Sequence, residues 1–246
     1  MRTCAQLILL GLCPKPKNHP LCGWIIIIMK RGRKMVDVYL VRHCETFANQ
    51  KVTFAGWTDY DVTEKGQKQL DALAERMKSV HFDKIYSSHL IRAKKTADAM
   101  NTGSDAPIEI NDAFLEIYMG DLEDRPVAEM SGEPRRRWFE ELYNFEAPGG
   151  ESMDDVAKRA WNGLMEVVRE NDGKTVGIAT HGGAILSLWR LLLRLPREEI
   201  GKIKWSGNTA VYRVRFTDEE RWEIVTENDD SHLSDELRSD SIESWK

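Results

Sequence analysis

The sequence has little cysteine, and the few cysteines are unevenly placed. Only 4 of the 246 residues are cysteine, and three of them, Cys4, Cys13 and Cys22, precede residue 35. This distribution excludes the class of small secreted domains that depend on a framework of disulfide bridges. It is typical of a protein from a reducing compartment, so we expect a cytoplasmic location.

Long hydrophobic runs are also missing. The two apolar runs near the N-terminus, Leu7–Leu12 and Trp24–Met29, are far shorter than the roughly 20 residues that cross a bilayer. We therefore expect no integral membrane span. A field of positive charge is absent as well, because the formal net charge is −5, with 35 basic and 40 acidic residues. This balance argues against a nucleic-acid partner.

The charge that is present is unevenly distributed. Residues 1–34 contain seven Lys or Arg and no acidic residue, whereas residues 228–246 contain six acidic and two basic residues. We therefore predict three parts: an accessory N-terminal leader over residues 1–34, outside the fold; a domain over residues 35–228; and an acidic, flexible tail over residues 229–246. Two alternatives for the leader stay open, namely a signal peptide and an amphipathic surface anchor.

Between leader and tail, strand-like and helix-like patterns alternate. Short β-branched runs predict strands over residues 36–41, 84–88, 108–110 and 175–180, and a terminal hairpin over residues 210–216 and 221–226. Apolar residues at helical spacing predict helices over residues 63–77, 91–100, 154 onward and 184–195. Residues 44–62 and 120–150 are predicted to be irregular. The alternation is typical of an α/β fold, a three-layer α/β/α sandwich with a mostly parallel central sheet.

Two of the predicted strands are followed by a histidine. Arg42 and His43 end the first run, and His181 follows the run over residues 175–180. Because ligands of parallel α/β sheets bind just beyond the carboxyl ends of the strands, we expect these side chains to share one rim. Two histidines and an arginine at one rim indicate phosphate chemistry.

Transfer of a phosphoryl group requires a nucleophile, cationic donors around the phosphate oxygens and an acid for the leaving group. His43 is the candidate nucleophile as a neutral imidazole, a form that nearby arginines favour. Arg42 and Arg92 are candidate phosphate clamps, and Arg92 opens a helix whose first amides attract anions. His181 is followed by Gly182, which lets the backbone approach a phosphate closely.

The segment Leu40–Thr46 reads Leu-Val-Arg-His-Cys-Glu-Thr. Together with Asn49, this segment resembles the signature of the histidine phosphatase superfamily, which includes the phosphoglycerate mutases. Further blocks resemble the family in the same order: Gly56–Asp59 with Thr63–Gly66, Ser87–Ala97, Leu115–Glu116 with Gly120, Pro148–Ser152, and Thr180–Gly183. Each block alone is weak evidence, but their order and spacing over about residues 36–216 make the resemblance specific. It implies a phosphoglycerate mutase-like fold.

The resemblance also implies roles for individual residues. The histidine that matches His43 becomes transiently phosphorylated, and the acid that matches Glu116 protonates the departing oxygen. The implied catalytic residues are His43, Glu116, His181, Arg42 and Arg92, and the implied phosphate-binding residues are Arg42, Asn49, Arg92, His181 and Gly182. Neither a metal nor another cofactor is implied.

The sequence departs from the family pattern at three places. Cys44 stands where a glycine is usual, His89 where a proline is common, and residues 121–124 replace a glycine-containing stretch after the acid. We interpret Cys44 as a small packed residue rather than a second nucleophile. Two further features are interpreted from their patterns. Arg135–Arg137 is either an anion-binding part of a lid or a solvated helix face, and Trp189 belongs to the core.

Four functions are compatible with these residues. They are a metal-independent phosphatase that forms a phosphohistidine on His43, a phosphoglycerate mutase, a noncatalytic phosphate-binding protein, and a metal site built from His43, Cys44 and His181. The adjacent arginines would repel a metal cation. A mutase must retain and reorient its bisphosphate intermediate. The stretch Glu116–Asp124 lacks the set of basic and aromatic residues that mutases of this family usually have after their acid, so the phosphatase is favoured. We expect a small phosphorylated substrate and a monomer or homodimer.

Overall fold

The computed structural model of the protein describes residues 34–239. The predicted leader therefore lies, but for Lys34, outside the described residues, as does the end of the predicted tail. Between these limits the chain forms one six-stranded sheet with the strand order β3-β2-β4-β1-β5-β6. The strands are β1 (Val36–Arg42), β2 (Lys84–Ser87), β3 (Ile108–Ile110), β4 (Thr175–Thr180), β5 (Val211–Phe216) and β6 (Trp222–Asp229).

The sheet is mostly parallel, as the sequence predicts. Strands β1, β2, β3 and β4 run parallel to one another, and the hairpin of β5 and β6 adds an antiparallel edge to β1. Of the two innermost strands, β4 is buried in all but its first residue, and β1 alternates buried with half-buried residues over most of its length. These two strands are the ones that carry the histidines.

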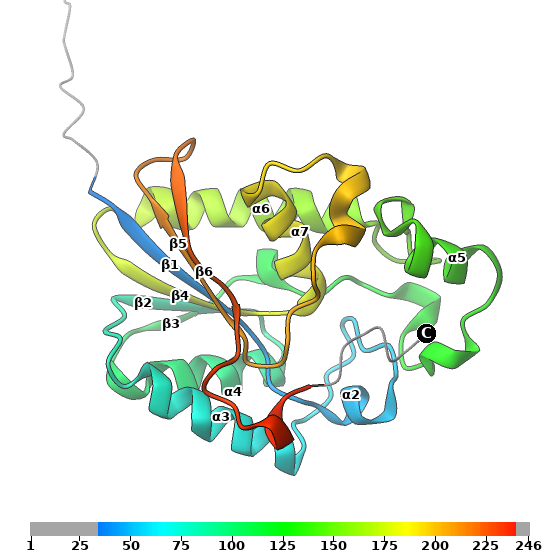
Figure 1. The fold of residues 1–246 in the computed structure, drawn as a ribbon, viewed down its shortest axis with the longest axis horizontal. Helices are drawn as coiled ribbons and strands as arrows, with labels where there is room; N and C mark the ends of the chain where they lie inside the picture. The colour runs from blue at the N-terminus through cyan, green and yellow to red at the C-terminus, as the bar shows by residue number, and fades with distance from the viewer. Residues whose placement is uncertain (1–33, 240–246) are drawn as a thin grey trace, which may run out of the picture. The chain divides into compact units, whose positions relative to one another are not determined.

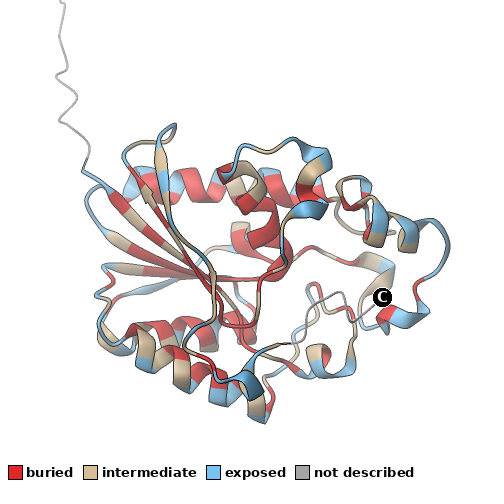
Figure 2. Cartoon of the chain, viewed as in Figure 1, coloured by how far each residue is buried: buried red, intermediate tan, exposed pale blue. Residues whose placement is uncertain are grey.

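Helices cover both faces of the sheet, which confirms the three-layer arrangement (Figure 1). The pair α3 and α4 packs on one face, and the pair α6 and α7 packs on the other. The helices are α2 (Phe47–Lys51), α3 (Glu64–Met77), α4 (Ile91–Met100), α5 (Gly132–Glu140), α6 (Met153–Glu170) and α7 (Gly182–Leu192). Figure 2 shows the buried residues on the strands and on the inward sides of these helices.

The hydrophobic core has three parts. One lies between the sheet and α6 and α7, and it includes Trp189, which is fully buried as predicted. A second lies between the sheet and α3 and α4. The third joins Phe54 to residues of the irregular segment, such as Met119 and Trp138, and to α7. This third part anchors the loops beyond the carboxyl ends of the parallel strands.

Most helix boundaries follow signals in the sequence. The Thr63 hydroxyl accepts a hydrogen bond from the N–H of Gly66, at 2.9 Å, and thereby caps α3 as predicted. Helix α4 has the predicted bounds. Helix α7 begins at Gly182, two residues before the predicted start, and ends at Leu192.

Two helices lie in segments predicted to be irregular. The five-residue α2 is held by a capping box between Thr46 and Asn49 rather than by an apolar stripe. Helix α5 contains Pro134 and lies within residues 120–150, which were predicted to be irregular. The proline stands in the first turn, where its missing N–H would have no helical partner, so the helix tolerates it.

The C-terminal segment differs from the sequence expectation of a flexible tail. Up to Ser239 it is docked: Arg76 of α3 pairs with Asp229, and the Gln69 side-chain amide donates to the carbonyl of Leu237, at 2.7 Å. The side chain of Leu233 is buried. Residues 229–239 therefore pack against α3.

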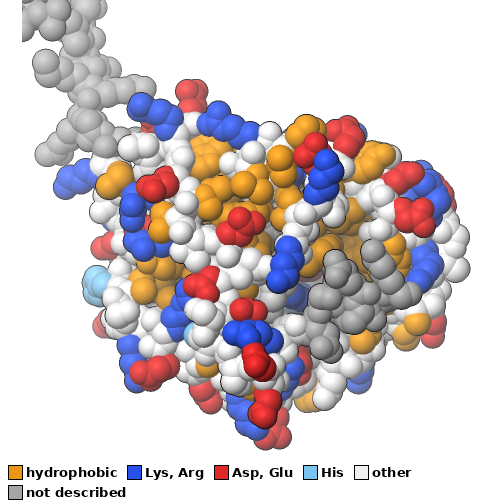
Figure 3. Space-filling model, viewed as in Figure 1, with side chains coloured by type: hydrophobic (Ala, Val, Ile, Leu, Met, Phe, Trp, Pro, Cys, Tyr) orange, Lys and Arg blue, Asp and Glu red, His pale blue; other side chains and the backbone are white. Residues whose placement is uncertain are grey.

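The described surface carries charges of both signs. On the face shown in Figure 3, Lys and Arg side chains alternate with Asp and Glu around hydrophobic areas. Within residues 34–239, no helix is long and apolar enough to cross a membrane.

Candidate active site

The strand register brings the two histidines together. In the parallel pair of β1 and β4, Arg42 lies opposite Thr180, and a histidine is the next residue on each strand. The N–H of His43 donates to the carbonyl of Thr180, at 2.9 Å, which continues the pairing by one residue. The two imidazole centroids lie 5.2 Å apart.

The hydrogen bond of His43 determines its tautomer. Its Nδ1 lies 2.6 Å from the backbone carbonyl oxygen of Cys44, which can only accept. Nδ1 therefore carries the proton of the neutral ring, and the lone pair is on Nε2. Burial, together with the positive charges of Arg92 and Arg42, lowers the pKa of His43 well below its usual value of 6.5. The ring is therefore neutral, with an unprotonated nitrogen, at neutral pH.

His181 has one occupied and one unoccupied ring nitrogen. Its Nε2 lies 2.7 Å from the Ser88 hydroxyl, whereas its buried Nδ1 has no hydrogen-bond partner within residues 34–239. Burial and the charge of Arg92 lower the pKa of His181 as well. Buried polar atoms without partners are rare in proteins. An anion that accepts a hydrogen bond from Nδ1–H would satisfy this one.

Arg92 is buried and Arg42 is half-buried, and each has N–H groups that make no hydrogen bond within residues 34–239. Arg42 donates Nη1–H to the carbonyl of Ser206, but its buried Nε has no partner within the described part of the chain. Arg92 donates to the carbonyls of Ala55, Gly56 and Thr58, at 3.0, 2.7 and 2.9 Å. These bonds use three of its five N–H groups. Arg92 thus holds one loop and keeps two donors for a ligand.

Glu116 lies at the N-terminus of α7. Its Oε1 accepts hydrogen bonds from the N–H groups of Gly183 and Ile117, both at 2.9 Å, while Oε2 lies 3.2 Å from the Gly183 nitrogen. The first amides of α7 thus fix the orientation of the Glu116 side chain. Burial lowers the pKa of Arg42 and of Arg92, and the charge of Glu116 opposes this shift in both. The acid and the two arginines therefore lie close together.

The remaining predicted phosphate-binding residues are Asn49 and Gly182. Asn49 accepts hydrogen bonds on Oδ1 from the N–H and hydroxyl of Thr46, which leaves only its NH₂ group for a ligand. Within residues 34–239, the hydrogen bonds of its side chain are to Thr46 and do not join it to either histidine. Gly182 begins α7, and a β-carbon there would lie 3.5 Å from Arg42 Nε. The start of α7 thus adjoins the arginine.

The start of α4 does not offer its amides to an anion, contrary to the sequence expectation. The N–H of Ile91 donates to the carboxylate of Asp59, at 2.8 Å. The protein's own carboxylate therefore occupies the position that was predicted for a ligand, and Arg92 contributes through its side chain alone.

Cys44 is a packed residue. Its side chain is fully buried, and burial raises the pKa of the thiol to about 12. At neutral pH it is therefore not a thiolate and is a poor nucleophile. Within residues 34–239, no three His, Cys, Asp or Glu side chains are grouped closely enough to hold a metal ion. The reading of His43, Cys44 and His181 as metal ligands thus has no support among the described residues.

Arg136 and Arg137 belong to a solvated helix face. Both donate to Glu133 of their own helix, and Arg136 also pairs with Glu141. Arg135 lies over the ring of Phe139, 4.7 Å from its centroid. The carboxylates of Glu133 and Glu141 thus offset the charges of Arg136 and Arg137.

Several residues that support the site were assigned no role from the sequence. Ser88 contacts His181, and Asn208 donates its side-chain amide to the carbonyl of His43, at 2.9 Å. Arg159 of α6 donates to the carbonyls of Leu115 and Glu116, at 2.8 Å each. Such contacts join segments that are distant in sequence, so no local sequence pattern predicts them.

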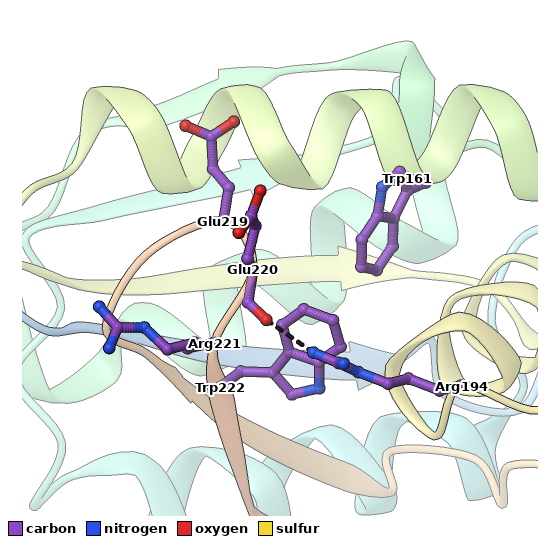
Figure 4. Close-up of a pocket in the computed structure, with 6 residues that line it drawn as sticks. All are labelled: Trp161, Arg194, Glu219, Glu220, Arg221 and Trp222. Carbon is purple, nitrogen blue, oxygen red and sulfur yellow. Dashed lines mark hydrogen bonds between the residues drawn. The ribbon is translucent and has the colours of Figure 1, made fainter.

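A surface depression at the other end of the sheet has different properties. It is lined by Trp161, Arg194, Glu219, Glu220, Arg221 and Trp222 (Figure 4). Trp222 pairs through Phe216 with Val36, the first residue of β1, whereas His43 follows the last. Arg194 lies over the Trp222 ring and donates to the carbonyl of Glu220, at 2.6 Å. The depression is therefore separate from the histidines.

We predict that Gly183→Ala displaces the acid. A β-carbon at this position would clash with Glu116 Oε1. Alanine favours the helix, so the variant should fold while its turnover of phosphate esters falls by roughly tenfold or more. Steady-state kinetics and a thermal unfolding curve would check this. Gly201→Ala is the control, because a β-carbon there meets nothing within 4 Å. Unchanged turnover in Gly183→Ala would contradict the placement of Glu116.

The chain is similar in sequence and in fold to several known proteins. Residues 38–230 match the model of the histidine phosphatase superfamily (branch 1). The probable phosphoglycerate mutase GpmB of Salmonella choleraesuis (strain SC-B67) is 30% identical over 207 residues, which cover 81% of this chain and 95% of that protein. YhfR of Bacillus stearothermophilus has a similar structure, with a TM-score of 0.75 and 28% identity over 80% of this chain and 98% of that chain. A mycobacterial glucosyl-3-phosphoglycerate phosphatase has a TM-score of 0.72 and 26% identity, covering 79% and 99% of the two chains.

Proposed function

Since this chain belongs to the histidine phosphatase superfamily, we propose that it is a metal-independent phosphatase that hydrolyses phosphate monoesters through a phosphohistidine on His43. The observation that carries the proposal is the tautomer of His43. The Cys44 carbonyl holds the proton on Nδ1, so the lone pair of Nε2 is available for attack.

In the first step, Nε2 of His43 bonds to phosphorus while the ester P–O bond breaks. The proton of Glu116 passes to the leaving oxygen, so an alcohol departs rather than an alkoxide. Positive charge develops on the imidazole and is stabilised by the Nδ1–H bond to the Cys44 carbonyl. The phosphate oxygens accept hydrogen bonds from Arg42, Arg92 and Nδ1–H of His181.

In the second step, the Glu116 carboxylate removes a proton from a water molecule. The water oxygen bonds to phosphorus as the N–P bond breaks, which releases inorganic phosphate. His43 is again neutral and Glu116 is again protonated. Each group thus returns to its starting state, and one ester and one water become one alcohol and one phosphate.

The runner-up is a phosphoglycerate mutase, as the name of the Salmonella relative suggests. A mutase must retain and reorient a bisphosphate, which requires cations on the leaving-group side. Residues 117–124 provide none. A structurally similar chain is named a glucosyl-3-phosphoglycerate phosphatase, which supports hydrolysis as an activity of this fold.

The test is a panel of phosphorylated metabolites with two readouts, release of inorganic phosphate and isomerisation of 3-phosphoglycerate. Phosphate release without isomerisation is the expected result. Isomerisation that outpaces phosphate release would establish the mutase instead. Binding of phosphate without turnover of any ester would establish the noncatalytic alternative.

We predict that activity survives EDTA. Arg42, Arg92 and His181 supply the positive charge and hydrogen-bond donors that a metal would supply elsewhere. Phosphate release should therefore be the same, within error, before and after chelation. Loss of activity that zinc or magnesium restores would contradict the proposal and revive the metal site.

A further inference from the structure

We propose that Trp57 and Tyr118 bind the leaving group, and that the substrate is a phosphate monoester whose leaving group is uncharged and has a flat, apolar face. The two residues are called here the aromatic shelf. This inference rests on the proposed function, because it concerns the alcohol that departs from His43.

In the aromatic shelf, Trp57 is exposed and Tyr118 is half-buried. Trp57 is 41% exposed, whereas Trp189 and Trp138 are 0% and 8% exposed. The rings of Trp57 and Tyr118 lie with their centroids 4.8 Å apart and their planes inclined by 38°. Aromatic rings that contact each other and remain open to solvent form a surface on which another ring or the C–H face of a sugar can stack.

The shelf adjoins the acid. The indole Nε1–H of Trp57 donates to the backbone carbonyl of Glu116, at 2.9 Å. Arg92 donates to the carbonyls of Gly56 and Thr58, the two neighbours of Trp57. A phosphate held by Arg92, with its leaving oxygen at Glu116, therefore presents the leaving group to the shelf.

The donors around the shelf are already in use. The backbone N–H of Trp57 donates to Glu123 at 2.8 Å, and that of Tyr118 donates to Glu151 at 2.9 Å. Carboxylates thus occupy the amides that an anionic leaving group would need.

The nearby cation is also committed. Arg159 donates to Glu151 through two bonds and to the carbonyls of Ala113, Leu115 and Glu116. These bonds use all five of its N–H groups. A leaving group with a carboxylate would therefore meet two carboxylates and no unused guanidinium donor from this arginine.

The test compares two alkyl esters, 2-phenylethyl phosphate and ethyl phosphate. Their alcohols have comparable acidity, so they depend similarly on the acid and differ mainly in the ring. The measured quantity is the ratio of their kcat/KM values. The ratio does not depend on the fraction of enzyme that is folded, so a destabilised variant still gives an answer.

Trp57→Ala should lower this ratio by roughly tenfold, the effect of about one aromatic contact. Trp57→Phe keeps a stacking face but loses the bond to Glu116, and its ratio should stay within roughly threefold of the wild-type value. Trp161→Ala, at the other end of the sheet, should leave the ratio unchanged. An unchanged ratio in Trp57→Ala would overturn the inference.

Other results separate this inference from the proposed function. If Trp57→Ala and Trp57→Phe slow both esters equally, Trp57 positions Glu116 and the shelf does not bind the leaving group. If the wild-type protein prefers 3-phosphoglycerate to glycerol 3-phosphate, the leaving group is not uncharged, although hydrolysis stands. If the wild-type protein hydrolyses no ester, both proposals fail.

Discussion

His43→Ala should abolish phosphate release and leave the fold intact. The expected loss is roughly 10³-fold or more, because the variant has no Nε2 at position 43 to form the bond to phosphorus. The strand pairing uses the backbone N–H of residue 43 rather than its ring, so alanine preserves the register of β1 and β4. Initial rates, with circular dichroism as a check of folding, would measure both effects.

A matched control is His81→Ala, which removes an exposed histidine. This variant should retain the wild-type rate. Wild-type enzyme quenched during turnover of labelled substrate should carry an acid-labile, alkali-stable phosphate on His43. Retention of more than a few per cent of the rate by His43→Ala, or persistence of the label in it, would remove His43 from the mechanism.

Glu116→Gln should slow alkyl phosphates much more than aryl phosphates. Glutamine keeps an oxygen that can accept from Gly183 and Ile117, as Oε1 does. It replaces Oε2, which would carry the proton and lies 3.2 Å from the Gly183 nitrogen, by an NH₂ group. An alkoxide needs that proton in the transition state, whereas a nitrophenolate barely does. Hydrolysis of alkyl phosphates should therefore fall by roughly 10²-fold or more.

The informative measurement is kcat/KM for a series of esters whose leaving groups differ in acidity. A steeper dependence on leaving-group acidity in Glu116→Gln is the expected outcome. Equal slowing of every ester would mean that Glu116 orders the site without donating a proton. The search for the acid would then move to Asp121, Glu123 and Asp124.

The sheet and the position of the histidines were predictable, because both follow from local patterns. The runs that form β1 and β4 are short and apolar, and each ends at a polar residue. The rule that ligands bind at the carboxyl ends of parallel strands then placed His43 and His181 together. The parallel register, in which Arg42 faces Thr180, had to come from the structure.

The supporting contacts were not predictable from the sequence. Asp59 occupies the start of α4, and Arg159 reaches from α6 to the carbonyl of Glu116. Both join segments that approach each other only after folding. Helix α5 was missed for another reason, since the position of Pro134 within the first turn is visible only once the helix boundary is known.

The C-terminal segment has a consequence for how the protein loses activity. Ser239 donates its hydroxyl to the side chain of Asn208, which in turn holds the carbonyl of His43. His232 contacts the hydroxyl of Thr209, whose N–H donates to the carbonyl of Arg42. The bonds made by Ser239 and His232 are only partly buried, so the segment can open locally while the buried strands stay paired. Such an opening would remove hydrogen bonds that hold the backbone at Arg42 and His43. We therefore expect the protein to lose activity under milder conditions than those that unfold it.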